Sequence, residues 1–226
     1  LPPNRGLLLP PNRGAGVGSG GSPLPPVSPV PLRSCGPFST LWQEGFQDTI
    51  LLHRGQLRAM VDYIADNPRR LAVKRAHPEL FTVVGSHSIL SDLTCPVIGN
   101  RYLLQHPVKR QVQVSRRISA DELSAKCEEL LYAAEHGSVL VSPCISPGEK
   151  QIARAALEAE RPLIVLLAHG FRPHYKPPKH YFDACAEGRL LMIAPFPYQR
   201  RKQAVTREQC LQLNAWAQAV AEATGD

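Results

Sequence analysis

The sequence lacks three features that would each point to a familiar kind of protein. None of its eight histidines forms a His-x-His pair, and none of its six cysteines forms a C-x-x-C pair. No apolar run approaches the roughly 20 residues that span a bilayer. These absences argue against a zinc ribbon, a disulfide framework and a membrane partner. The scattered cysteines are typical of reduced, mostly buried thiols, so we expect a cytoplasmic protein.

Positive charge is present, but it is distributed unevenly along the chain. Residues 1–120 carry a surplus of eight positive charges, whereas residues 121–226 carry one net negative charge. This asymmetry favours a polyanionic partner for the first half of the chain, and the alternative is a generic basic surface that keeps the protein soluble.

Residues 1–38 are rich in proline, glycine and serine, and Leu1–Gly6 recurs at 9–14. The segment has too few periodic apolar residues to bury a face, so we expect it to be disordered. The repeat is either a short linear motif or the translation of duplicated or out-of-frame DNA, and we favour the second interpretation. Because the chain starts with Leu1, we also expect it to be a fragment or an incomplete reading frame.

One helix is expected before the main domain. Leu57, Met60, Val61 and Ile64 follow the spacing of one helical face over residues 55–66. We expect the helix to stop at Asn67-Pro68, since proline cannot continue the hydrogen-bond ladder. Residues 85–110 show no readable pattern.

The rest of the chain alternates between apolar strands and capped helices. Strands are expected at 112–115, 138–142, 163–168 and 190–194, and helices at 119–135, 146–159, 181–187 and 206–223. Capping boxes open three of these helices, at Ser119, Ser146 and Thr206. Strands that are apolar throughout are typical of a parallel sheet covered on both faces. The predicted fold is therefore α/β, with a Rossmann-like, doubly wound parallel sheet over residues 85–226.

Residues 39–84 resemble the C-terminal part of a REP-associated, single-tyrosine (HUH-type) transposase. The resemblance is carried by Trp42, Gln43, Phe46, Asp48, Tyr63, Ile64, Asn67 and Pro68. It implies a helical transposase remnant in which Tyr63 is the nucleophile that attacks a DNA phosphodiester. Without the resemblance, Tyr63 is an aromatic residue beside an apolar stripe, and such a residue is usually a packing tyrosine.

The resemblance also implies a divalent metal, Mg²⁺ or Mn²⁺, held by an upstream His-hydrophobe-His motif that this chain lacks. A phenol with a pKa near ~10 is a poor nucleophile without such help. We therefore expect no cofactor in this chain and no covalent DNA adduct when it is incubated with oligonucleotide and Mg²⁺ or Mn²⁺. An adduct on a denaturing gel that disappears in Tyr63→Phe would contradict this prediction.

Four basic residues follow the tyrosine helix: Arg69, Arg70, Lys74 and Arg75. They are candidates to contact DNA phosphates. A solvated basic turn is an equally good interpretation of the same residues.

The chain from 137 to 170, together with Val114–Ser119, resembles the Rossmann core of the DNA-processing-A (Smf) family. The free N–H groups expected after Ser146-Pro147-Gly148 could bind an anion, with Lys150 adding charge. Ser115 and Arg116 would lie at the same edge of the sheet. This chain departs from the family because Pro143, Pro147 and Glu149 replace a glycine-rich loop, and a plain capping box is the alternative.

These features lead to a DNA-binding, transposase-derived protein that acts on single-stranded DNA and is incomplete as a transposase. The alternative is a nucleotide-binding or nucleotide-processing module without DNA activity. A third reading is a folded remnant that binds nothing, because a fold does not fix a function. A nucleotide and a second copy of the chain, forming a homodimer, are further candidate partners.

Overall fold

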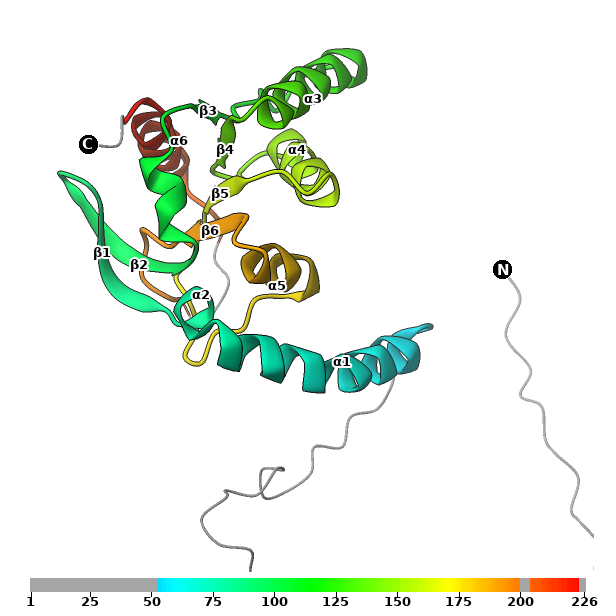
Figure 1. Cartoon of the computed structure of the whole chain (residues 1–226). Coiled ribbons are helices and arrows are strands. Elements are labelled where there is room, and N and C mark those ends of the chain that lie inside the picture. The colour runs from blue at the N-terminus through cyan, green and yellow to red at the C-terminus, as the bar shows by residue number, and fades with distance from the viewer. Residues whose placement is uncertain (1–52, 200–203, 224–226) are drawn as a thin grey trace, which may run out of the picture. The chain divides into compact units, whose positions relative to one another are not determined.

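Six strands form one mostly parallel sheet in the order β1-β2-β6-β5-β4-β3 (Figure 1). The computed structural model describes residues 53–199 and 204–223. The parallel strands are β3 (Lys109–Gln111), β4 (Val139–Ser142), β5 (Leu163–Leu166) and β6 (Leu190–Ile193). An antiparallel hairpin, β1 (Val84–Leu90) and β2 (Leu93–Gly99), joins the sheet beside β6. The predicted α/β class with a mainly parallel sheet is confirmed.

Helices cover both faces of this sheet, which explains why its central strands are apolar throughout. On one face lie α3 (Ala120–Glu135), α4 (Pro147–Glu158) and α5 (Lys179–Ala186), and on the other α6 (Arg207–Glu222) and the short 3-10 helix η1 (Arg101–Gln105) (Figure 1). Neighbouring strand residues point to opposite faces. In β4, for example, Leu140 packs in the core under α3 and α4, whereas Val139 and Val141 pack in the core under α6.

The three expected capping boxes are all present with both of their hydrogen bonds. Ser119, Ser146 and Thr206 each accept a hydrogen bond from the backbone N–H three residues later. The side chain of that later residue in turn accepts a hydrogen bond from the backbone N–H of the capping residue. Each box satisfies N–H groups that the first helical turn would otherwise leave free, so it defines where the helix begins.

The region that showed no pattern holds the β1–β2 hairpin. Its register shifts twice and β2 contains Pro96, so neither the strict alternation nor the unbroken apolar run of a strand is present. The expected strand at 112–115 was wrong in its bounds, because β3 covers Lys109–Gln111. Val112 nevertheless continues the edge by donating its N–H to the carbonyl of Val141 at 2.8 Å.

Helix α1 (Gln56–Ala76) runs through Pro68, so the expected stop at Asn67-Pro68 was wrong. Proline removes the bond to the carbonyl of Ile64 and usually bends or ends a helix. Here Ile64 is exposed, so water can reach that carbonyl. The turns after Pro68 are fixed instead by tertiary contacts, because Arg70 is 7% exposed and is held against α5.

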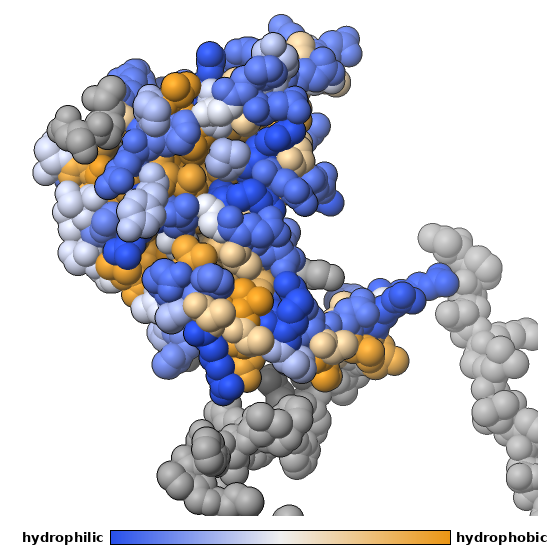
Figure 2. All heavy atoms as spheres, viewed as in Figure 1, coloured by the Kyte–Doolittle hydropathy of each residue, from blue (hydrophilic) through white to orange (hydrophobic). Residues whose placement is uncertain are grey.

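The apolar stripe that predicted α1 faces solvent within the described part of the chain. Leu57, Met60, Val61 and Ile64 are all exposed, and Figure 2 shows hydrophobic atoms along the edge of α1 opposite α5. No helix among the described residues is long and apolar enough to cross a bilayer. The short helix α2 (Pro78–Phe81) connects α1 to β1. The segment expected to be disordered and the motif containing Trp42 lie outside the described residues.

Candidate functional site

The carboxyl ends of β4, β5 and β6 lie at one edge of the sheet. The loops that begin there cover residues 143–146, 167–178 and, as far as they are described, 194–199. In open α/β sheets ligands bind at this edge, because backbone groups and loop side chains converge there. The side chains that lie at this edge determine which ligands the edge can bind.

At the start of α4 a buried carboxylate accepts the backbone N–H groups of the preceding loop. Glu149 is 3% exposed, and its carboxylate accepts the N–H of Ile145 at 2.7 Å and that of Ser146 at 3.0 Å. A longer bond of 3.4 Å comes from the N–H of Val114, beyond the end of β3. A carboxylate here satisfies donors that could otherwise receive a phosphate. The N–H groups of Ile145 and Ser146 are therefore already paired.

The other residues of the expected phosphate site each have contacts or surroundings of their own. The Ser146 hydroxyl accepts the N–H of Glu149 at 3.1 Å, and a Cβ added to Gly148 would lie 3.1 Å from Leu123, so this glycine lets α4 approach α3. Lys150 is exposed and lines a groove between α4 and α5. The Ser115 hydroxyl accepts the N–H of Arg117, and Arg116 donates to the thiol of Cys210 on α6. The structure thus places Arg116 against the helix on the opposite face from α4.

An aromatic hollow of about 750 Å³ opens between the loops after β5 and β6 and the start of β2. Its aromatic lining comes from three segments, which are α2, the loop after β5 and the loop after β6. The aromatic residues are Phe81, Phe171, Tyr175, Phe196 and Tyr198, and the side chains of Arg172 and His174 line the same hollow. Phe171 and Tyr175 have ring centroids 4.8 Å apart, and Tyr198 is 46% exposed. Flat apolar walls with a guanidinium at the rim suit a planar, partly anionic ligand.

Gly170 holds the two loops of the aromatic hollow together. Its N–H donates to the carbonyl of Pro197, and a Cβ added here would lie 2.3 Å from the backbone nitrogen of Tyr198. No residue with a side chain fits this crossing without moving the backbone. The glycine therefore sets the spacing between the loop that carries Arg172 and the loop that carries Tyr198.

A second hollow, of about 890 Å³, lies between α4 and α5 and reaches the loop after β4. Cys144 lines it with a left-handed backbone (φ 49°) and a thiol 3.3 Å from the Ser142 hydroxyl. Burial raises the pKa of Cys144 to about 11, so the thiol stays protonated near neutral pH. Cys144 is consequently a poor nucleophile, and the charged side chains lining this groove carry both signs.

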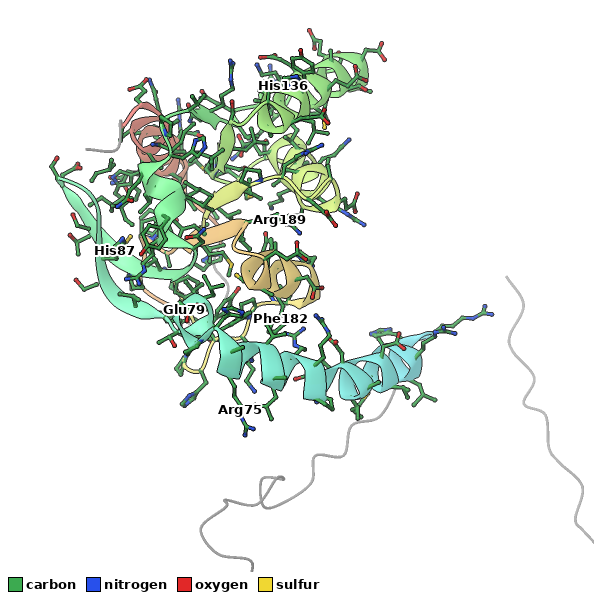
Figure 3. The ribbon with its side chains drawn as sticks, viewed as in Figure 1. Arg75, Glu79, His87, His136, Phe182 and Arg189 are labelled. Atoms are coloured by element: carbon green, nitrogen blue, oxygen red, sulfur yellow. The ribbon has the colours of Figure 1, made fainter. Side chains whose placement is uncertain are left out.

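Three of the four basic residues that follow Tyr63 are engaged with α5. Arg69 pairs with Asp66 and with Asp183 of α5, and Arg70 lies over the ring of Phe182 at 4.0 Å. Lys74 lies over the same ring at 5.7 Å, which Figure 3 shows extending from α5 toward α1. Arg75 points away from α5 (Figure 3). The expected basic cluster is therefore divided between a packing contact and an exposed cation.

Tyr63 lies on the exposed first half of α1, with about half of its surface accessible. Among residues 53–199 and 204–223, no three histidine, cysteine or acidic side chains lie close enough together to hold a metal ion. The described residues thus offer no fit for the metal that the transposase resemblance implies. The role of Tyr63 as a nucleophile stays a prediction.

A scan against protein-family models and a search of curated proteins returned no match. Among solved structures, the chain is similar to DNA processing protein A from Helicobacter pylori, described for its mode of single-stranded DNA binding. The two are 16% identical with a TM-score of 0.46, over 64% of this chain and 67% of that one. The resemblance to a tyrosine transposase finds no support in these comparisons.

Sequence reasoning missed the aromatic hollow. Most of its residues lie in the loops that follow two predicted strands, in Gly170-Phe171-Arg172 after β5 and in Phe196-Pro197-Tyr198 after β6. Aromatic residues that follow consecutive parallel strands meet at the same edge of a sheet, so this position was a usable signal. The contribution of Phe81 could not be inferred, since it reaches the hollow from α2.

Proposed function

We propose that this chain binds single-stranded DNA at the carboxyl edge of its sheet, with an unpaired base in the aromatic hollow. The observation that carries the proposal is the set of aromatic side chains with Arg172 at one opening between two loops. Every base has a flat face that stacks on such rings, and a guanidinium can contact either the base or its phosphate. A duplex hides those faces, so the hollow favours an unpaired strand.

Charge supports the same proposal. The chain carries a formal net charge of +7, and its surplus of positive charge falls within residues 1–120. This positive charge attracts a polyanion, and the release of counterions adds to the free energy of binding. From the resemblance to a tyrosine transposase, the proposal keeps only the contact with DNA. Strand cleavage by Tyr63 would require a longer chain that supplies a metal.

A mononucleotide is the less favoured ligand. Phosphate binding in Rossmann-like folds relies on free N–H groups at a helix start. In this chain the Glu149 carboxylate lies at the start of α4 and accepts the N–H groups of Ile145 and Ser146, just before the first turn. Saturable binding of a mononucleotide, without binding of an oligonucleotide, would favour this second function and contradict the first.

Binding should be measured by fluorescence anisotropy with a labelled oligothymidine, a duplex of the same length and the matching RNA. We expect the single strand to bind more tightly than the duplex. Tyr198→Ala and Arg172→Ala should each weaken binding about tenfold, because stacking on one base contributes roughly 1–3 kcal/mol.

Tyr132→Ala is the matched control for Tyr198→Ala. Tyr132 is also an exposed tyrosine, but it lies on α3 and contacts His136 instead of the hollow. Equal affinities of the Tyr198 and Tyr132 variants, or equal binding of duplex and single strand, would rule out the hollow as the binding site.

A further inference from the structure

One side of helix α1 is apolar and faces solvent. More than half of the exposed large hydrophobic side chains in the described part of the chain lie on this helix: Leu57, Met60, Val61, Tyr63, Ile64 and Leu71. Single apolar residues at a protein surface are ordinary, whereas a continuous row of them usually marks a surface that binds another molecule. Figure 2 shows this apolar row along the edge of α1 opposite α5.

The domain holds α1 by the other, polar side of the helix. Arg70 is 7% exposed and lies over the ring of Phe182 at 4.0 Å. Arg69 pairs with Asp183 of α5. These contacts involve the second half of the helix, and every residue from 57 to 65 in the first half is exposed. Most helical stability in proteins comes from packing of the apolar face, and the described part of the chain leaves that face of α1 uncovered.

The apolar row has the spacing of a helix that packs against another helix. Exposed positions follow one another in alternating steps of four and three residues: Leu57, Val61, Ile64, Pro68, Leu71 and Arg75. This heptad spacing keeps one seam of a helix turned toward one partner helix. The seam from Leu57 to Leu71 is roughly 20 Å long. A membrane surface imposes no such spacing, because it contacts whatever apolar area a helix presents.

Basic side chains lie at both ends of the apolar row. Arg58 precedes Val61 by three positions and so flanks the row, and Arg75 follows Leu71 by four positions and continues it. Both arginines are exposed, and neither forms an ion pair within the described part of the chain. Arg75 points away from α5 (Figure 3). Asp62, the acidic residue of the exposed half, lies about 100° round the helix from Val61 and thus off the row.

The two arginines disfavour a second copy of this chain as the partner. In an antiparallel pair of α1 helices, Arg75 of one copy would lie beside Arg58 of the other, and in a parallel pair the two Arg75 side chains would meet. Like charges at such flanking positions oppose helix pairing. A helix with acidic residues beside its apolar face would instead place opposite charges against both arginines.

We infer that the outer side of α1 binds an amphipathic helix of another protein, and that acidic residues flank the apolar face of that helix. Leu57, Val61 and Ile64 supply apolar contacts, and Arg58 and Arg75 select an acidic partner. The first half of α1 gains in the complex the packing that the domain does not give it. Binding at this surface does not require DNA in the aromatic hollow.

Two synthetic peptides of three heptads each test this interaction. Both carry leucine or isoleucine at their seam positions, but one has glutamate and the other lysine at the flanking positions. Fluorescence anisotropy with the full chain should show saturable binding of the glutamate peptide and at least about tenfold weaker binding of the lysine peptide. Equal binding of the two peptides, or no binding of the glutamate peptide, would overturn the inference.

Substitutions in the apolar row locate the binding surface. Ile64→Ala should weaken binding of the glutamate peptide about tenfold, because it removes one aliphatic side chain from the middle of the seam. Leu57→Ala and Leu211→Ala form a matched pair, since both leucines are 62% exposed but Leu211 lies on α6. The first should weaken binding about fivefold and the second should leave it unchanged. Equal effects of the two would show that the peptide does not bind α1.

The Arg58→Glu/Arg75→Glu double variant tests the choice of partner. It should prefer the lysine peptide about tenfold, since the flanking charges are reversed. An unchanged preference would overturn the role of the two arginines. Circular dichroism establishes that each variant is folded.

The other possible occupants of the apolar row are tested with the same Ile64→Ala variant. Sedimentation of the wild type should show a monomer, and vesicles of anionic lipid should not bind it. A dimer that Ile64→Ala dissociates, or vesicle binding that Ile64→Ala abolishes, would assign the row to a second copy or to a membrane and overturn the inference. The affinity for oligothymidine should be unchanged in Ile64→Ala, so this inference and the proposed function can fail separately.

Discussion

Replacing Glu149 with alanine is expected to lower the free energy of unfolding by about 3 kcal/mol, since buried donors that lose a charged acceptor are costly. The carboxylate accepts the backbone N–H groups of Ile145 and Ser146, and more weakly that of Val114. Removing it also breaks the capping box that starts α4. Urea unfolding followed by circular dichroism measures the change.

Glu149→Gln separates shape from charge. The amide oxygen can still accept one N–H, but the amide nitrogen meets donors, so we expect about half of the loss. Glu158→Ala on the same helix is the matched control: its side chain is exposed and pairs only with Arg154, so its loss should stay below about 0.5 kcal/mol. A loss in Glu149→Ala as small as in Glu158→Ala would show that the buried carboxylate does not stabilise the loop.

Phe182→Ala should lower the free energy of unfolding by about 4 kcal/mol, the usual cost of truncating a buried phenylalanine. The ring is fully buried, stacks on Phe81, and carries the guanidinium of Arg70 on its face. Its removal opens a cavity in the core and also detaches the second half of α1. Urea unfolding measures the first effect, and the rate of tryptic cleavage in α1 measures the second.

Phe182→Leu distinguishes the two roles of the ring. Leucine keeps most of the buried volume, so the unfolding loss should fall to about 1.5 kcal/mol. It offers no π face to the cations, so cleavage after Arg69, Arg70 and Lys74 should accelerate as much as in Phe182→Ala. Unchanged cleavage in both variants would mean that α1 is held by other contacts. Tyr132→Ala, an exposed ring on α3, should change neither measurement.

The elements that sequence reasoning found correctly depend on residues close together in the chain. A capping box joins positions three apart, as Ser119 and Glu122 show, and the apolar run 163–166 reads directly as a buried strand. The β1–β2 hairpin was missed because its register shifts and Pro96 disturb both patterns. The end of α1 was placed too early because Pro68 is a strong local signal, whereas the contact that outweighs it, Arg70 on Phe182, spans more than a hundred residues.

The residues at the candidate site divide in the same way. Ser146 and Glu149 could be recognised as a cap from the sequence alone, but the bond from Val114 to that carboxylate needed the fold. By itself the sequence determined the α/β class, the succession of strands and helices along the chain, and the surplus of positive charge in residues 1–120. Only the tertiary structure decided that the Glu149 carboxylate accepts the N–H groups of Ile145 and Ser146, and that Phe81 joins the loops after β5 and β6 around one aromatic hollow. Periodicity and capping are local properties of the chain, whereas a site depends on which distant segments pack together.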